Sequence, residues 1–273
     1  MSFKHSTSPS AILGSLLNHR ELIWEMVKRD FIGRYKGSFM GMAWSLFHPL
    51  LMLVVYTLVF SVAFKARWGV GEESKVAFGL VLFSGMIVHG LFAECLNRAP
   101  SLIVSQPNYV KKVVFPLEVL PWVAVLSALL HFLVSLGLLL VFCLASGVGL
   151  QPGVALVPLV TLPLILMALG LTWLFAALGV YLRDIAQGMG VLTTVLMFLS
   201  PVFYPASSLP EGFRRLLAFN PLTLPIEQIR DVMLWGKPIH WDAWGISLLI
   251  GCGTAWMGFW WFQKSRKGFA DVL

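Results

Sequence analysis

Ionisable side chains are rare within the long apolar stretches of this sequence, and their types restrict the chemistry that those stretches could perform. His89, Glu94 and His131 stand inside them. A protein that couples transport to protons or ions usually places several paired charges at membrane depth, because a lone buried charge is costly. We expect Glu94 to pair with Arg98 one helical turn later, and the two histidines to be hydrogen-bonded packing residues rather than proton carriers.

Motifs for catalysis and nucleotide binding are missing from the sequence. It contains no G-x-x-x-x-G-K-[ST] loop that could cradle phosphates, and no H-E-x-x-H, C-x-x-C or G-x-S-x-G pattern. We therefore expect no enzymatic activity, no metal site and no cofactor on this chain. Any ATP and Mg²⁺ would have to be bound by a separate chain. A membrane-embedded transferase is the alternative class, and it predicts activity from the purified chain alone.

The composition is that of a membrane protein. Of the 273 residues, 58% are hydrophobic and 12% are charged, and the mean hydropathy is +0.82. A soluble domain carries roughly twice that charge. Because so few charged residues cannot form the polar surface of a globule of this size, most apolar side chains must face lipid.

Six apolar stretches are long enough to cross a hydrocarbon core, which takes about 20 helical residues. We therefore predict an all-α integral membrane protein with six transmembrane helices in a membrane domain over 44–262. A cytoplasmic N-terminal region (1–43) would precede this domain, and a short cytoplasmic tail (263–273) would follow it. The charged turn Arg183-Asp184 separates the fourth stretch from the fifth. The predicted spans cover residues 44–64, 76–95, 119–145, 154–182, 185–203 and 243–262.

The distribution of Lys and Arg predicts the orientation. With six spans and a cytoplasmic N-terminus, 13 of the 20 Lys and Arg residues fall on the cytoplasmic side. This bias follows the positive-inside rule and places both termini in the cytoplasm.

Three segments outside the spans have the pattern of short helices. Residues 20–36 are amphipathic and predict an interfacial helix, which either anchors the chain or has a functional role. The loop at 97–116 contains a short apolar helix between Pro100 and Pro107, a suitable contact for a partner protein. Residues 204–241 contain two proline-bounded helices, at 211–219 and 226–235, which predict a re-entrant hairpin or else a peripheral amphipathic loop.

Aromatic side chains are abundant, with 20 Phe, 11 Trp and 5 Tyr. Trp and Tyr at span ends are typical of interface belts. Aromatic rings within spans could instead line a path for sugars, because a flat ring offers the C–H face of a sugar an uncharged contact. The candidates for such a path are Tyr56, Phe60, Phe83 and Phe198.

Several motifs, in this order along a six-span chain, resemble the permease subunits of bacterial polysaccharide exporters of the ATP-binding-cassette type. These proteins move O-antigen, capsule or teichoic acid chains. One departure is the run Asn220-Pro221-Leu222-Thr223-Leu224-Pro225, where many members have a basic or hydroxyl residue soon after Asn-Pro. The matching pieces are Arg29-Asp30-Phe31 with Arg34-Tyr35-Lys36, Gly41-x-x-Trp44-x-x-x-x-Pro49-Leu50, Lys111-Lys112-Val113-x-Phe115-Pro116-x-Glu118, Val180-Tyr181-x-Arg183-Asp184, Ser200-Pro201-Val202-Phe203-Tyr204-Pro205, and Ile226-Glu227-x-x-Arg230-Asp231.

The resemblance implies a homodimeric channel in the bacterial inner membrane that works with two copies of an ATP-binding-cassette ATPase subunit. The implied substrate is a polysaccharide on undecaprenyl pyrophosphate, most simply an O-antigen; capsule, teichoic acid, or a small lipid or drug is the alternative. No nucleic acid is implied as a partner.

The resemblance also assigns roles to residues. Ser101, Leu102, Ile103, Val104, Lys111 and Lys112 would form the contact with the ATPase. Glu227, Arg230 and Asp231 would belong to the outer re-entrant pair. Arg29, Arg34 and Lys36 are cationic, close to the headgroup plane and next to the first span, and we expect them to recognise the lipid pyrophosphate.

Overall fold

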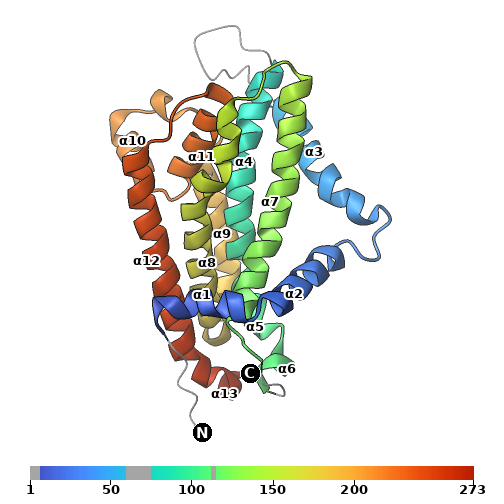
Figure 1. Cartoon of the computed structure of the whole chain (residues 1–273), viewed down its shortest axis with the longest axis vertical. Coiled ribbons are helices and arrows are strands. Elements are labelled where there is room, and N and C mark those ends of the chain that lie inside the picture. Colours follow the sequence, from blue (N-terminus) through green and yellow to red (C-terminus); the bar gives the residue numbers. More distant parts are fainter. Residues whose placement is uncertain (1–6, 60–74, 112–114) are drawn as a thin grey trace.

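The computed structural model describes residues 7–59, 75–111 and 115–273. All regular elements within these ranges are helical. Helices α4 (Lys75–Arg98), α7 (Val119–Ala145), α8 (Val157–Tyr181) and α12 (Trp241–Ser265) run along the long axis of a bundle (Figure 1). This arrangement confirms the predicted all-α class.

Helix α8 is the central element of the bundle. It packs along α12 and also contacts α4 and α7. Glycine makes the α8–α12 contact close: a Cβ on Gly258 would lie 1.9 Å from the carbonyl oxygen of Gly170, and one on Gly251 would lie 2.6 Å from that of Pro163. Small residues permit such approach between membrane helices, where backbone packing provides much of the attraction.

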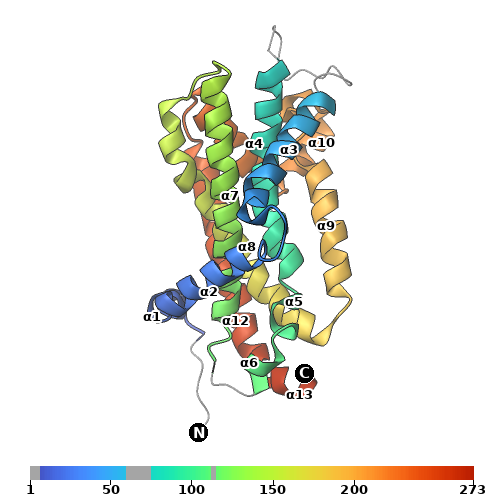
Figure 2. The ribbon, with the colours of Figure 1, turned by 90° about the vertical axis from the view of Figure 1, so that its right-hand side faces the viewer.

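Five helical segments in the described part of the chain are long and apolar enough to cross a membrane. The predicted fifth span instead forms the 15-residue helix α9 (Ile185–Leu199), which rises about 22 Å at 1.5 Å per residue. It lies against α4 (Figure 2) and ends immediately before Ser200-Pro201, because proline cannot continue the helical hydrogen bonding. By length alone, the six-span count is therefore not confirmed. The five segments are Gly41–Val59, Val76–Arg98, Val119–Ala145, Pro152–Tyr181 and Trp241–Val272.

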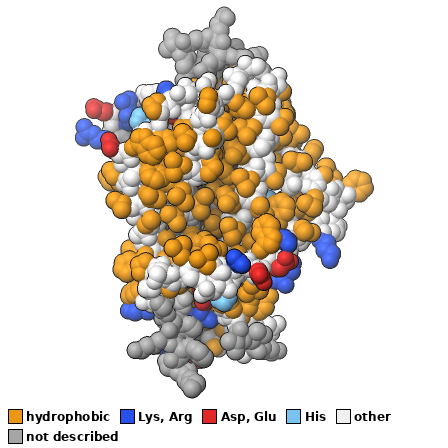
Figure 3. All heavy atoms as spheres, viewed as in Figure 1, with side chains coloured by type: hydrophobic (Ala, Val, Ile, Leu, Met, Phe, Trp, Pro, Cys, Tyr) orange, Lys and Arg blue, Asp and Glu red, His pale blue; other side chains and the backbone are white. Residues whose placement is uncertain are grey.

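Apolar side chains cover the middle of the bundle, and charged side chains gather toward its two ends (Figure 3). A single band of this kind fits immersion in a bilayer, where lipid replaces water around the apolar surface.

The predicted interfacial helix is present but shorter than expected. Helix α2 (Arg20–Gly33) follows α1 (Pro9–Asn18), and both lie across the bundle near one end (Figure 1). Ile23 and Val27 of α2 are buried, and the helix packs on α7. Turns over residues 34–40 then lead to a 3₁₀ turn (Gly41–Ala43) and to α3 (Trp44–Tyr56).

Short helices cap both ends of the bundle. At the end near α1 and α2 lie α5 (Ser101–Val104), α6 (Pro107–Lys111) and α13 (Phe269–Val272), the last preceded by a 3₁₀ turn (Arg266–Gly268). A 3₁₀ turn (Pro152–Leu156) precedes α8 at the opposite end, where α10 (Glu211–Ala218) and α11 (Thr223–Arg230) also lie. Another 3₁₀ turn (Ala206–Ser208) precedes α10, and a π-helical turn (Asp231–Trp235) follows α11. Both short helices predicted within 204–241 are thus present, the second beginning three residues earlier than predicted.

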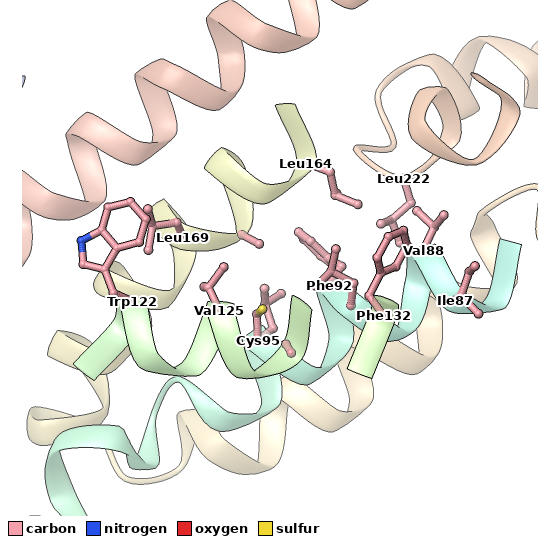
Figure 4. Close-up of a cluster of buried hydrophobic side chains, with 14 of the residues drawn as sticks. Ile87, Val88, Phe92, Cys95, Trp122, Val125, Phe132, Leu164, Leu169 and Leu222 are labelled. Carbon is pink, nitrogen blue, oxygen red and sulfur yellow. The ribbon is translucent and has the colours of Figure 1, made fainter. Parts of the chain in front are cut away.

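A buried apolar cluster fixes α4 and α7 against α8 (Figure 4). Phe92 and Cys95 of α4 meet Val125 and Phe132 of α7, with Leu164 of α8 beside them. This packing fixes α4 and α7 relative to each other. Helices α2 and α3 contact this pair, and the candidate site lies between them.

Candidate functional site

A cavity of about 600 Å³ lies between α3, α4, α7 and the turns after α2. We call it the aromatic cavity. Tyr56 and Phe83 line one part of it, and Arg34, Glu94 and His131 line another. Phe83 and Glu94 are eleven residues apart on α4, which separates them by about 16 Å along the helix. The cavity therefore extends from an aromatic region to a charged one.

The charged region is a cluster of ion pairs between α2, the residue that follows it, and α4. Arg34 Nη2 lies 2.5 Å from Glu94 Oε1 and 3.3 Å from Asp30 Oδ2. Arg98 Nη2 lies 2.6 Å from Asp30 Oδ1, and its Nη1 lies 3.7 Å from Glu94 Oε1. We call these four residues the ionic cluster. The predicted Glu94–Arg98 pair is present, but the closer partner of Glu94 is Arg34.

Helix α7 completes the ionic cluster with polar side chains. Ser127 donates a 2.6 Å hydrogen bond to Asp30, and His131 Nδ1 lies 3.0 Å from Glu94 Oε2. The Tyr35 hydroxyl lies 3.0 Å from His131 Nε2. Both ring nitrogens of His131 therefore have hydrogen-bond partners. Nε2 of the other histidine, His89, lies 2.9 Å from the Thr193 carbonyl oxygen. The hydrogen bonds predicted for the two histidines are present, and their role as packing residues rather than proton carriers stays a prediction.

The electrostatics of Asp30 follow from this arrangement. Burial alone raises the pKa of the carboxyl group, but hydrogen bonds from Arg98 and Ser127, and the positive charges of Arg98 and Arg34, outweigh that effect. The pKa of Asp30 is consequently below its ordinary value, and the carboxylate is ionised at neutral pH.

A second cavity, of about 470 Å³, lies on the other side of Arg34, and we call it the cationic cavity. Arg29, Arg34 and Arg98 line it together with a single carboxylate, that of Asp30. Its wall also includes Ser105 and Gln106 from the segment between α5 and α6. Arg34 therefore borders both cavities.

The structure brings together two of the three residues predicted to recognise pyrophosphate. Arg29 and Arg34 line the cationic cavity, whereas Lys36 is exposed and lines neither this nor the aromatic cavity. Sequence reasoning missed Arg98 and Asp30 as members of the site. The available signal was the four-residue spacing of Asp30 to Arg34 and of Glu94 to Arg98, which allows an ion pair on each helix.

Only some of the aromatic residues predicted to line a path for sugars lie in the aromatic cavity. Tyr56 and Phe83 line the aromatic cavity, whereas Phe198 projects from α9 with 59% of its surface exposed. Phe198 still belongs to the same aromatic group, because its ring lies 5.7 Å from that of Phe203, which lies 6.1 Å from Tyr56. Phe60 lies outside the described residues.

The loop at 97–116, predicted to contact a partner protein and called here the partner-binding loop, packs closely against α8. A Cβ on Gly179 of α8 would lie 2.2 Å from the Pro100 carbonyl oxygen, so only glycine fits there. Ser101 and Lys111 are exposed, Leu102 and Val104 are half-buried, and Ile103 is buried and supports α5 from within. Lys112 lies outside the described residues.

The C-terminal segment braces this loop from the other side. Arg266 Nη1 lies 2.5 Å from Glu118 Oε2, and Arg266 Nη2 donates to the Phe115 carbonyl oxygen at 3.0 Å. Phe269 of α13 is fully buried next to Phe262. The segment predicted as a short tail (263–273) is thus packed against the end of the loop.

At the opposite end of the bundle, Arg230 of α11 is buried and joins α4 to the turn after α9. Its guanidinium donates to the carbonyl oxygens of Val81, Pro201 and Val202 at 3.1, 2.5 and 3.0 Å. Asn220 adds a second connection, because its side chain donates to the Leu199 carbonyl oxygen and accepts from the Leu222 N–H.

The carboxylates beside Arg230 line a third cavity, of about 540 Å³, together with Lys237 and His240. Asp231 lies 3.3 Å from Lys237 Nζ. Burial, and then the charge of Asp231, raise the pKa of Glu227. The three residues predicted for the outer segment, Glu227, Arg230 and Asp231, therefore line the same cavity. The guanidinium of Arg230, however, binds backbone carbonyl oxygens.

Within the described residues, no three His, Cys, Asp or Glu side chains are grouped so that they could hold a metal ion.

The chain is similar in sequence to known membrane transport proteins. An O-antigen export system permease protein of Myxococcus xanthus is 32% identical over 264 residues, covering 96% of this chain and 99% of the relative. A protein of the same description from Klebsiella pneumoniae is 24% identical, covering 93% and 95%. A polysialic acid transport protein of Escherichia coli is 22% identical over 209 residues, covering 76% and 79%. Residues 21–234 match the family described as ABC-2 type transporter, and the chain therefore belongs to the membrane proteins of that family.

Proposed function

We propose that this chain is the permease subunit of an ATP-driven exporter that moves a polysaccharide, of the O-antigen class, on undecaprenyl pyrophosphate from the cytoplasm across the inner membrane. The relatives described as O-antigen export permeases, which align over nearly the whole chain, support the substrate class. The observation that carries the proposal is the aromatic cavity, in which Tyr56 and Phe83 lie beyond the charged residues Arg34 and Glu94.

The chemistry of such a substrate suits the two regions. A sugar chain is uncharged over much of its length and can slide along aromatic rings through C–H contacts. A pyrophosphate is strongly anionic and pairs well with guanidinium groups, which form bidentate hydrogen bonds to phosphate oxygens. Arg29 and Arg34, which line the cationic cavity, would take the pyrophosphate.

A homodimer of six-span subunits would provide the complete channel. The short helix α9 would serve as the remaining crossing, with local thinning of the bilayer accommodating its length at modest cost. The helices α1, α2 and α13 lie at one end of the bundle, which supports a cytoplasmic position for both termini (Figure 1). The outer pair α10 and α11 would enter the opposite leaflet as a re-entrant hairpin.

A separate ATP-binding-cassette ATPase would dock on α5 and α6. Their exposed residues Ser101 and Lys111 lie at the cytoplasmic end in this orientation, and the loop is braced by α8 and by the C-terminal segment. Because α4 leads directly into α5, a push on this loop would move the helix that carries Glu94 and Arg98.

Complementation with co-purification tests the proposal. The gene should restore surface polysaccharide to a strain that lacks its own O-antigen permease, when supplied together with its ATPase. The purified complex should hydrolyse ATP, and the chain alone should not. Absence of a nucleotide-binding partner, or turnover of a substrate by the chain alone, would contradict the proposal.

Capsule export is the second candidate, favoured by the similarity to the polysialic acid transport protein. A teichoic acid, small lipid or drug permease of the same family remains the broader alternative. Transport assays with glycans of increasing length separate a polysaccharide exporter from a small lipid or drug permease, because only the former should accept long chains.

A further inference from the structure

The cationic cavity is shared by two parts of the chain that are distant in sequence. Helix α2 contributes Arg29 and Asp30, and the segment after α5 contributes Ser105 and Gln106. Arg98 stands between them as the last residue of α4, three residues before α5 begins. Any ligand in this cavity would touch the interfacial helix and the partner-binding loop at once.

The charge of the cavity wall is unbalanced. Three guanidinium groups face one carboxylate, that of Asp30, which its hydrogen bonds keep ionised. Glu94, which lines the aromatic cavity, lies 2.5 Å from Arg34 and 3.7 Å from Arg98, so the remaining positive charge is that of Arg29. Arg29 is exposed and donates a 3.2 Å hydrogen bond to the neutral hydroxyl of Tyr109 in α6. A wall of this charge attracts an anion.

Uncharged hydrogen-bond donors in the cavity wall indicate which class of anion it could bind. The Ser105 hydroxyl and the Gln106 amide add uncharged hydrogen-bond donors beside the arginines. A group with several acceptor oxygens, such as a phosphate, can satisfy both kinds of donor. The apolar part of the wall, which includes Met26, Leu120 and Val123, would lie against a hydrocarbon chain attached to that group.

We propose that the cationic cavity binds the phosphate-bearing headgroup of a prenyl lipid and that the bound headgroup links α2 to the partner-binding loop. The assignment rests on the proposed function for the identity of the cargo, and it adds Arg98, Ser105 and Gln106 as binding residues while leaving Lys36 outside. Occupancy of the cavity stabilises one position of α5, so cargo binding and ATPase docking favour each other by the same factor.

Isothermal titration calorimetry on the full chain in phosphatidylcholine nanodiscs tests the site directly. The probes are geranyl pyrophosphate, geraniol as the uncharged analogue, and inorganic pyrophosphate. Geranyl pyrophosphate should bind most tightly. The variants R98Q and R29Q should each weaken its binding about tenfold or more, because each removes a charged hydrogen-bonding group.

The matched control is K28Q, which removes a positive charge from the neighbouring position on α2. Lys28 pairs with Glu25 at 2.8 Å on an exposed part of the helix and lines neither cavity. Its substitution should change the affinity less than about twofold, within the range expected of a solvent-exposed charge. R29Q keeps the test valid if R98Q fails to fold, because Arg29 is exposed and lies outside the ionic cluster.

Three results would overturn the assignment. Equal weakening by K28Q and R98Q would show only a diffuse charge effect. Equal affinity for inorganic and geranyl pyrophosphate would assign the cavity to a free anion. Unchanged affinity for geranyl pyrophosphate upon addition of the ATPase would remove the link to the loop. None of these measurements depends on export, so a chain that binds the probe as expected but exports no polysaccharide would contradict the proposed function alone.

Discussion

Arg230 donates a 3.0 Å hydrogen bond to the carbonyl oxygen of Val202, and so connects α11 to the turn that ends α9. The same guanidinium also reaches Val81 in α4. Gly85 makes room for it, since a Cβ there would lie 2.6 Å from Arg230 Nη2. One buried side chain thus holds three segments of the outer end together.

Replacement of Arg230 by methionine should lower the free energy of unfolding by about 3–5 kcal/mol, because the buried carbonyl oxygens lose a charged donor. Denaturant titration in detergent measures this change. The control is R215M on α10, whose side chain is 81% exposed and which should change stability by less than about 0.5 kcal/mol. Similar effects from both variants would contradict the assigned role of Arg230.

Gly179 sets the position of the partner-binding loop. The variant G179A would force its Cβ against the Pro100 carbonyl oxygen and displace α5, at a cost of about 1–3 kcal/mol. In the complex with its ATPase, we expect ATP hydrolysis to continue while export falls. The control is G188A on α9, where an added Cβ meets nothing within 4 Å. Equal export by the two variants would show that this contact does not position the loop.

Sequence reasoning located the long helices well because their signal is local. Continuous apolar runs predicted α4, α7, α8 and α12. Proline marked the starts of α5 and α10, whereas α11 begins two residues before Pro225. Helix α9 ends before Ser200-Pro201, and the apolar side chains of Pro201, Val202 and Phe203 concealed that end.

The candidate site was only partly predictable because its contacts join distant residues. The Arg34–Glu94 and Asp30–Arg98 pairs require α2 to lie against α4 and α7, which no local pattern specifies. Arg230 shows the same limit: it is buried and donates to the carbonyl oxygens of Pro201 and Val202 in a distant turn, which no local pattern specifies.

Tyr56 offers a direct test of the aromatic cavity as part of the export path. The variant Y56A should slow polysaccharide export about fivefold, corresponding to the loss of an aromatic contact of about 1 kcal/mol. Y56F keeps the ring and should export at nearly the rate of the unmodified protein. Export rates are measured in vesicles with labelled glycan, at matched protein levels. A similar loss in Y56F would implicate the hydroxyl group, and no loss in Y56A would remove Tyr56 from the path.

Asp30 makes the docking of α2 dependent on pH. Its pKa is lower in the folded chain than in the unfolded chain, so its ion pairs stabilise the fold fully above the ordinary pKa of about 4. That stability is lost as the pH falls from about 4 through the folded-state pKa, because protonation removes the charge that Arg98 and Arg34 contact. Thermal unfolding of the unmodified protein should therefore shift to lower temperature in this range. The variant D30N lacks the titrating group, and its unfolding temperature should already be lower at neutral pH and should fall less between neutral pH and pH 3. An equally steep fall in D30N would place the acid sensitivity in other carboxylates, and would contradict the view that Asp30 holds the interfacial helix to α4 through its charge.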